Sequence, residues 1–399
     1  MTLAPGLPLD AAVGLLLLAI AVAAITKRLD VPYTVALVVV GLILGSFSAH
    51  NSLNLTENTV LLLFVPALMF QAAIEIPWTG LRRNLWHILG LAVGGVILNA
   101  FLVAAAVHRV TSLSFTAALL FGSIVASTDP TAVVALFRDL KINKRLTLLI
   151  ESESLFNDGI AATLFLTVLA SATGSSMTLE RGAILFFQQC LGGAAIGGLL
   201  GWLMSFVTGH IDDLLIENAL TLVLAYGSYL VADHVHVSGL TSVLVAGLVV
   251  GNHGLPNRVH PEIRLSIQKF WEFAAFLANS LLFLLMGIKA VSLMKLFQWP
   301  QDFLLTLIIL VCRAVVVFLF LALSRRKNGR IPIRWQVVLS WGGLRGAVSV
   351  ALALSLPHDL PYAPALLGAV YATTLLTLLI QGSTIKPLVR WLKIPMREE

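Results

Sequence analysis

The chain has 399 residues, of which 58% are hydrophobic and only 12% are charged, and its mean hydropathy is +0.93. Soluble domains carry about 25% charged residues, so this composition excludes an ordinary soluble protein and indicates a polytopic membrane protein. Cys190 and Cys312 both lie in apolar runs, without disulfide or metal-ligand spacing, and we expect no cofactor. The formal net charge of +6 raises the question of nucleic-acid binding, which the positions of the basic residues answer.

Thirteen stretches are apolar enough to be membrane-spanning helices, which need about 20 mostly apolar residues. No basic residue precedes the first stretch, so we expect a permanent helix there and not a cleaved signal peptide. The linkers are short, and the sequence predicts no soluble domain. In chain order the predicted spans are residues 11–26, 33–50, 58–76, 88–107, 113–136, 146–172, 183–206, 215–232, 239–252, 270–288, 301–324, 336–356 and 363–385.

The basic residues in the predicted loops sort by side of the membrane. With the N-terminus outside, twenty Lys and Arg residues fall on the cytoplasmic side, and four, at positions 109, 181, 289 and 295, fall outside. This split follows the positive-inside rule and predicts a cytoplasmic C-terminus. The positive charge therefore reflects topology in the lipid bilayer, and we expect no nucleic-acid partner. The short segment after the last span favours a prokaryotic plasma (inner) membrane.

Six ionisable residues lie inside the predicted spans. Each costs about 2.5–3.5 kcal/mol on insertion scales and persists where it is paired, hydrated or functional. Glu151 is expected in a cytoplasmic funnel, and Arg313 either extends toward the cytoplasm or pairs with Glu151. The six are Asp129 in the fifth span, Glu151, Glu153 and Asp158 in the sixth, Arg313 in the eleventh and Arg345 in the twelfth.

Two of these spans contain helix-breaking residues. In the fifth span, Pro130 cannot donate a backbone hydrogen bond and disfavours helix at Asp129. In the twelfth, three glycines between positions 342 and 346 flank Arg345. Interrupted spans at matching places in two halves of opposite orientation are typical of secondary transporters with inverted repeats. The alternative is a proline kink and a glycine packing site in an unrelated fold.

The acidic stretch ESESLFNDGIA, residues 151–161, divides by helical face. Ser154 and Asp158 share one face, and Glu151 extends that face toward the cytoplasm. Because the sixth span runs outward, Asp158 is predicted near the middle of the membrane. Carboxylate, hydroxyl and carbonyl oxygens suit hard monovalent cations, and an unwound segment at Thr128 and Asp129 would add free carbonyls. We therefore expect a proton and a cation to compete for Asp158, which couples their fluxes.

Three motifs in chain order resemble the NhaP-type sodium/proton antiporters, within the cation/proton antiporter family that also contains the animal sodium/proton exchangers. They are Thr-Asp-Pro at 128–130, Glu-Ser-Leu-Phe-Asn-Asp-Gly at 153–159 and Gly-Leu-Arg-Gly-Ala at 343–347. The resemblance implies an all-α fold with inverted repeats, two interrupted helices and about thirteen spans, and a homodimer. It implies a dimerisation part, at about residues 1–85 and 183–290, and a moving core, at about residues 86–172 and 300–390.

The resemblance also implies roles for single residues. Asp158 matches the ion-binding aspartate, with Ser154 and Thr128 as co-ligands of Na+. Asn157, in the same ion-binding motif, stands where related electrogenic antiporters have aspartate, which implies electroneutral one-for-one exchange. Gln71 is a departure, because the family often has an acid there that helps to hold the ion.

Three charged residues complete the site implied by the resemblance. Glu153 and Arg345 match a buried ion pair that joins the halves of the core. Asp129 belongs to the ion-binding set and mainly balances helix-end dipoles. Glu151 and Arg313 are secondary candidates, as is the Gln71 position.

The predicted function is therefore exchange of Na+, or of Li+ or K+, for H+ by alternating access, without enzymatic activity. The alternatives are a K+/H+ antiporter of the same fold, a cation channel, or an intramembrane aspartyl hydrolase using Asp129 and Asp158. No predicted span shows a continuous polar stripe, which argues against a channel. The His-Glu-x-x-His pattern of zinc proteases is absent from the sequence.

Overall fold

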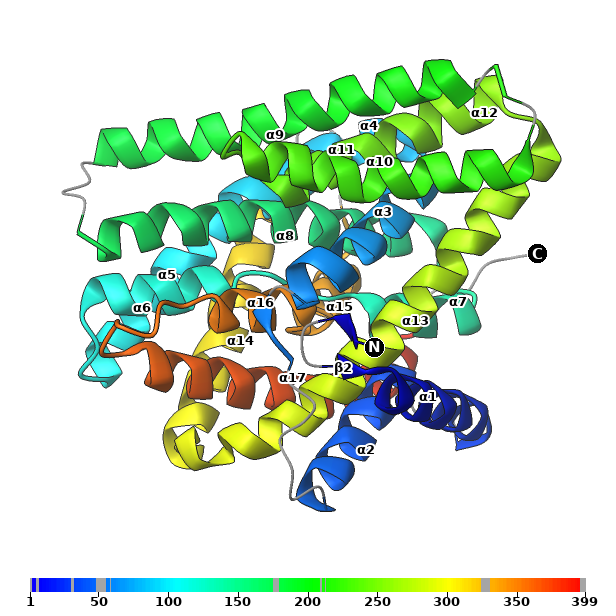
Figure 1. Cartoon of the computed structure of the whole chain (residues 1–399). Helices are drawn as coiled ribbons and strands as arrows, with labels where there is room; N and C mark the ends of the chain where they lie inside the picture. Colours follow the sequence, from blue (N-terminus) through cyan, green and yellow to red (C-terminus); the bar gives the residue numbers. More distant parts are fainter. Residues whose placement is uncertain are drawn as a thin grey trace.

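A computed structural model describes residues 2–4, 7–29, 32–47, 55–57, 59–174, 179–208, 210–211, 213–323 and 331–394 (Figure 1). Two short strands, β1 (Thr2–Ala4) and β2 (Leu7–Pro8), pair antiparallel ahead of the first helix. Seven basic residues assigned to the cytoplasmic side, at positions 27, 258, 325, 326, 327, 330 and 397, lie outside the residues whose side chains are described.

All other described elements are helical, including short π and 3-10 segments labelled η. They are α1 (Leu9–Leu29), α2 (Tyr33–Phe47), η1 (Thr59–Phe64), α3 (Val65–Glu75), α4 (Trp78–Leu89), η2 (Gly90–Gly95), α5 (Val96–Val110), α6 (Phe115–Ile124), α7 (Thr131–Asp139), α8 (Lys144–Ala172), α9 (Leu179–Thr208), α10 (Leu214–His234), α11 (Gly239–Val249), η3 (Val250–Gly254), α12 (Leu255–Arg258), α13 (Pro261–Leu293), η4 (Met294–Leu296), α14 (Trp299–Leu323), α15 (Ile333–Trp341), α16 (Ala347–Leu354) and α17 (Ala363–Trp391).

Within the described residues, each of the thirteen predicted spans overlaps helical structure. Seven helices in the described part of the chain are long and apolar enough to cross a membrane; that all thirteen cross stays a prediction. The fourth and tenth begin about ten residues earlier than predicted, at Trp78 and Pro261. The additional N-terminal segments carry charged residues such as Arg83 and Lys269, which a search for apolar runs excludes.

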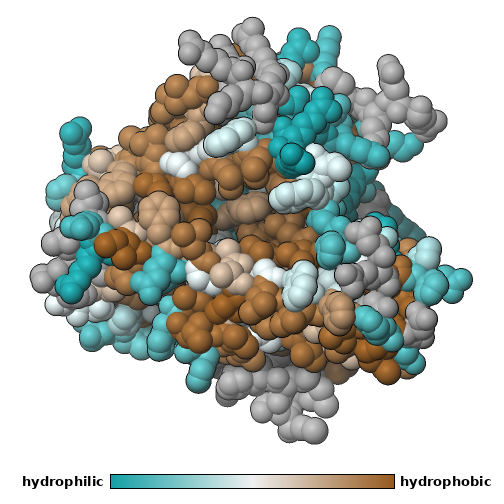
Figure 2. Space-filling model, turned by 90° about the horizontal axis from the view of Figure 1, so that it is seen from above, coloured by the Kyte–Doolittle hydropathy of each residue, from teal (hydrophilic) through white to brown (hydrophobic). Residues whose placement is uncertain are grey.

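The outer surface of the bundle is largely apolar. On α9, Ile184, Leu191 and Trp202 are each more than half exposed, as are Leu307 and Val311 on α14. Figure 2 shows hydrophobic residues over the middle of one face, with hydrophilic residues toward its two ends. A lipid bilayer covers large apolar surfaces that have polar margins. The exposed surface therefore agrees with the membrane protein that the composition indicates.

The two predicted interruptions are confirmed, and they meet inside the bundle. The chain between α6 and α7 is non-helical, as is the chain between α15 and α16. The segments cross, because the amide of Asp129 donates to the carbonyl of Leu344 at 2.7 Å. Figure 1 shows α16 beside α8, below the long helices α9 and α10. Four free helix ends are thus brought together in the interior.

The crossing requires glycine at position 346. A Cβ atom there would overlap the Asp129 carboxylate. We expect Gly346→Ala to lower the midpoint of thermal unfolding, because overpacking a tight site costs about 1–3 kcal/mol. Gly227→Ala is the control, since its Cβ would have no neighbour within 4 Å. Alanine is favoured over glycine in helices by about 1 kcal/mol, so this control should unfold no earlier than wild type. Equal midpoints for the two variants in detergent would contradict the account.

Candidate functional site

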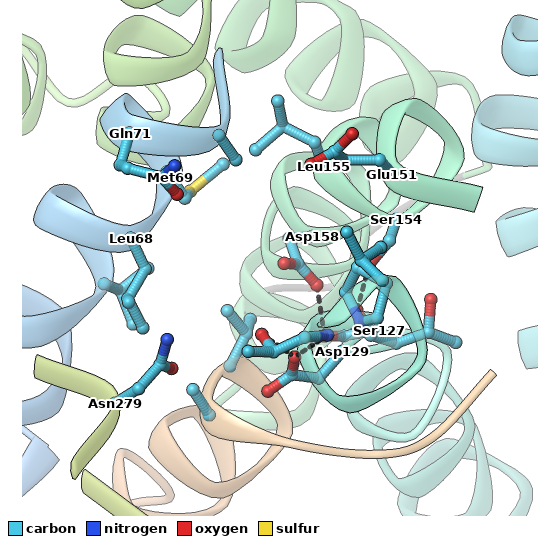
Figure 3. A pocket seen from close by; sticks show the side chains of 18 of the residues that line it. Leu68, Met69, Gln71, Ser127, Asp129, Glu151, Ser154, Leu155, Asp158 and Asn279 are labelled. Atoms are coloured by element: carbon cyan, nitrogen blue, oxygen red, sulfur yellow. Dashed lines mark hydrogen bonds between the residues drawn. The ribbon is translucent and has the colours of Figure 1, made fainter. Parts of the chain in front are cut away.

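A cavity of about 250 Å³ lies beside the crossing, between α3 and α13 on one side and α7, α8 and α16 on the other. Figure 3 shows Gln71 and Asn279 on one wall and Asp158, Ser127 and Asp129 on the opposite wall. The polar side chains of its lining are Gln71, Ser127, Thr128, Asp129, Thr131, Arg138, Glu151, Ser154, Asp158 and Asn279.

Asp158 extends from α8 into this cavity, as the face pattern predicted. Its carboxylate accepts a hydrogen bond from the Ser127 hydroxyl at 2.5 Å. Among the described residues, no Lys or Arg forms a salt bridge with Asp158, whereas the other acids around the crossing are held by bases or helix ends. Ser127 was not predicted as a site residue from the sequence. Its position beside Thr128, in the segment predicted to be unwound, could have indicated it.

The unwound segment is held by side chains of α8. The Ser154 hydroxyl donates to the Thr128 carbonyl. The Asn157 amide donates to the Thr128 hydroxyl at 2.6 Å and accepts from the Thr128 amide at 3.2 Å. Asn157 is fully buried and does not line the cavity, so its observed contacts hold the Thr128 segment, and its place in the ion-binding set stays a prediction.

Three carbonyls of this segment already accept hydrogen bonds, including that of Thr128, where a free carbonyl was predicted. The Arg345 guanidinium donates to the carbonyls of Ala126 and Ser127 at 3.2 and 2.9 Å, and Ser154 occupies that of Thr128. Arg345 thereby places a positive charge at the C-terminal end of α6, where the helix dipole is negative. Besides these carbonyls, the lining offers an ion the side-chain oxygens of Asp158 and Asn279.

Asp129 lies at the N-terminal ends of two helices. Its carboxylate accepts from the backbone amide and hydroxyl of Thr131, at 2.9 and 2.5 Å, where α7 begins. It also accepts from the backbone amide of Ala347, where α16 begins. A carboxylate is favoured at the positive end of a helix dipole, and one group here serves two.

The buried ion pair of Glu153 is formed with Arg313. The two terminal guanidinium nitrogens, Nη1 and Nη2, donate to the two carboxylate oxygens at 2.8 Å, and the Glu153 and Arg313 side chains are 2% and 6% exposed. The prediction that Glu153 pairs with Arg345 is therefore wrong, as is the alternative that Arg313 pairs with Glu151. The family motif contains Arg345 but not Arg313, so the resemblance implied Arg345 as the partner of Glu153. In space, Arg313 on α14 presents its planar fork to Glu153.

The charges around the crossing balance without Asp158. Asp129 and Glu153 are negative, and Arg313 and Arg345 are positive. Asp158 is the fifth charged group. Because the formal charges of the other four cancel, none of them compensates the charge of the Asp158 carboxylate. A desolvated carboxylate without a basic partner attracts a proton or a metal cation.

A second charged cluster lies at one end of the cavity. Arg138 donates to Glu75 at 2.6 Å and to Glu151 at 3.1 Å, and Gln71 donates to Glu75 at 2.5 Å. Glu151 is 17% exposed and paired with Arg138. It is therefore less accessible to water than the prediction of a cytoplasmic funnel implied. Sequence reasoning missed Glu75 and Arg138, although Glu75 follows Gln71 by one helical turn.

Asn279 on α13 was also missed. Its amide oxygen is buried and has no hydrogen-bond partner in the structure, and the side chain lines the cavity opposite Asp158 (Figure 3). Asn279 lies in a long apolar run, and the sequence does not distinguish a single amide that lines a site from one that only packs against a neighbouring helix. It adds an oxygen to the site from outside the two interrupted helices.

A buried carboxylate beside two crossing, interrupted membrane helices defines a secondary ion transporter with inverted repeats. The chain belongs to the sodium/hydrogen exchanger family, because the family model described as "Sodium/hydrogen exchanger, transmembrane" matches residues 14–391. The resemblance to the NhaP-type antiporters is thereby confirmed.

Individual relatives agree with this assignment. The chain is 39% identical over 363 residues to the Na+/H+ antiporter ApNhaP of Aphanothece halophytica, covering 90% of this chain and 69% of that protein. It is 34% identical over 391 residues to the Na+/H+ antiporter NhaH of Halobacillus dabanensis, covering 94% and 96%. The solved structure of the sodium proton antiporter MjNhaP1 from Methanocaldococcus jannaschii shares the fold, with a TM-score of 0.77 at 21% identity, over 96% of this chain and 99% of that one.

Proposed function

We propose that this protein exchanges Na+ for H+ across the membrane, with Asp158 as the group that binds either ion. The observation that supports this most strongly is the Asp158 carboxylate in a cavity, hydrogen-bonded by Ser127 and without a basic partner. The relatives named above are Na+/H+ antiporters. A hydrolytic pair of Asp129 and Asp158 is disfavoured, because the Asp129 carboxylate already accepts from both helix ends.

Competition for one carboxylate couples the two fluxes. A protonated Asp158 and a sodium-bound Asp158 are both neutral, whereas the empty carboxylate is charged and resists transfer through a low dielectric. Only the loaded forms therefore cross. Ser154 and Thr128 line the cavity beside Asp158 and supply further oxygens for Na+, a hard cation.

The position of the cavity supports alternating access. α3 and α13 belong to the dimerisation part proposed from the resemblance, at residues 1–85 and 183–290. α7, α8 and α16 belong to the proposed core, at residues 86–172 and 300–390. Movement of the core against α3 and α13 would open the cavity to each side in turn. We further propose a homodimer in the plasma membrane, with the N-terminus outside and the C-terminus cytoplasmic.

Ion exchange is tested in proteoliposomes with an acidic interior and a fluorescent dye quenched by the pH gradient. Adding Na+ outside should restore fluorescence, because sodium enters as protons leave. Li+ and K+ in parallel experiments decide between sodium and potassium exchange. A current driven by voltage without a proton gradient would instead indicate a channel and overturn the proposal.

Exchange is expected to be insensitive to membrane potential. The site offers one uncompensated carboxylate, and the neighbouring Asn157 is neutral, so one Na+ should replace one H+. The test clamps the potential with K+ and valinomycin at several values and measures the initial rate of Na+-driven proton efflux. Equal rates agree with electroneutral exchange. A rate that rises steadily with the potential would show that net charge moves, and would require a second titrating group.

A further inference from the structure

A second cavity, of about 570 Å³, lies next to the ion cavity, between the first turns of α4 and α8 and the end of α7. Its lining is unusually basic. Two acids, Glu75 and Glu151, are outnumbered by five bases: Arg83, Arg138, Lys141, Lys144 and Arg145. The cavity thus has an excess of three positive charges, and ion exchange of a cation makes no use of it.

The positive charge is concentrated away from the ion cavity. Arg138 bridges both acids, at 2.6 and 3.1 Å, so the negative charge of this cavity lies at that one wall. Elsewhere in the lining, Arg145 donates to the neutral amide of Asn84 at 2.9 Å. The charges of Arg83 and Arg145 oppose each other there. An anion bound between them would remove this repulsion.

The shape and the donors suit phosphate oxygens. The cavity is within the range of about 300–1,000 Å³ of ligand sites. Arginine forks and lysine ammonium groups are the usual partners of phosphate. The first turns of α4 and α8 both contribute to the lining, which places two positive helix ends beside the same basic side chains.

Basic residues placed only for membrane topology would not need to converge. Here residues from three helices, at positions 83, 138 and 144, line one hollow. They belong to the set assigned to the cytoplasmic side, which is the level of the lipid headgroups. We propose that this cavity binds a phosphate-bearing anion, supplied by the headgroup of an anionic lipid or by soluble phosphate.

The occupant would act on the ion site through a shared wall. Arg138 and Glu151 line both cavities. A bound anion attracts Arg138 and competes with Glu75 and Glu151 for its charge, so the entrance to the ion cavity becomes more negative. The apparent KM for sodium should therefore fall. This second step rests on the proposed exchange function, whereas anion binding does not.

Binding is measured first, without transport. Purified full-length protein in neutral detergent is titrated with phosphatidylglycerol and, separately, with inorganic pyrophosphate, while the thermal unfolding midpoint is followed. We expect a saturable rise of several degrees. A rise with the lipid alone identifies a headgroup, and a rise with pyrophosphate as well identifies soluble phosphate as sufficient. No rise with either probe would overturn the proposal.

Variants locate the site. Lys144→Gln and Arg83→Gln remove exposed charges from the cavity and should each reduce the rise at least several-fold, with an unchanged midpoint in the absence of probe. Arg390→Gln removes an exposed charge outside it and should keep the full rise. An unchanged rise in both cavity variants, or an equal loss in Arg390→Gln, would show general surface attraction and contradict a site.

The coupling is measured in liposomes of phosphatidylcholine with and without phosphatidylglycerol, or with pyrophosphate on the side where it binds. Wild type should show a several-fold lower KM for sodium when the anion is present, and Lys144→Gln should not. If the midpoint rises but the KM stays constant, the site binds an anion without regulating exchange, which overturns the coupling alone. If no exchange occurs at all, the proposed function fails while the midpoint data still decide the anion site.

Discussion

Asp158→Asn is expected to abolish sodium-driven proton movement, leaving only the rate of liposomes without protein. The amide has nearly the same shape and can still accept a hydrogen bond from Ser127, but it neither releases a proton nor balances the charge of Na+. Competition for the carboxylate is the whole of the proposed coupling. The measurement is initial dequenching of the pH-sensitive dye after addition of sodium.

The control for this variant is Asp139→Asn. Asp139 is exposed at the end of α7, so the same chemical change there should leave the rate within about twofold of wild type, as surface substitutions away from special features usually have small effects. Sodium-dependent exchange that persists in Asp158→Asn would exclude Asp158 as the coupling residue. Loss in both variants would point instead to damage during reconstitution.

Glu153→Gln is expected to destabilise the protein strongly. Breaking a buried ion pair costs about 3–5 kcal/mol, because the remaining charge is left without compensation. Here the glutamine oxygen could accept only one of the two 2.8 Å hydrogen bonds from Arg313, and its NH2 group would face the other guanidinium nitrogen, in a region where each side chain is almost fully buried. We expect a markedly lower thermal unfolding midpoint in detergent and a lower yield of folded protein.

An exposed ion pair provides the matched control. Glu272 accepts from Lys269 at 2.6 Å, and both side chains are more than 40% exposed. Glu272→Gln should shift the midpoint little, because surface pairs contribute about 0–1 kcal/mol. Similar midpoints for Glu153→Gln and Glu272→Gln would contradict a buried pair.

The partner of Glu153 can be identified by double substitution. Adding Arg313→Gln to Glu153→Gln removes the stranded charge, so the double variant should be more stable than the two single effects predict. Couplings between contacting residues are about 0.5–3 kcal/mol. Adding Arg345→Gln should give a smaller coupling, because Arg345 donates to the carbonyls of Ala126 and Ser127. A larger coupling of Glu153→Gln with Arg345→Gln than with Arg313→Gln would instead support the pairing of Glu153 with Arg345 that was predicted from the motifs.

The architecture was predictable because hydrophobic runs and helix breakers act locally. Pro130 and the glycines around Arg345 interrupt their helices through their own backbone chemistry, and the structure has both interruptions. The early starts of the helices at Trp78 and Pro261 were not predictable in the same way. Their first turns are amphipathic, so neighbouring helices and not average hydropathy determine where they begin.

The candidate site was predictable where a face of one helix defined it. Ser154 and Asp158 lie one turn apart, and both line the cavity. Contacts between distant helices were not predictable from spacing. Glu153 had two buried arginines available, and only the positions of α14 and α8 in space select Arg313. Asn279 and Ser127 join the site for the same reason, since tertiary packing brings them to the cavity.

The most direct test of the central claim is the release of protons when sodium binds. Purified protein in weakly buffered detergent solution, below the pH of half-maximal exchange, is mixed with sodium chloride, and the change in pH is calibrated with acid. Wild type should release one proton per chain at saturation, and Asp158→Asn should release none. Sodium binding to wild type without proton release, or equal release from Asp158→Asn, would contradict competition of the two ions for this carboxylate.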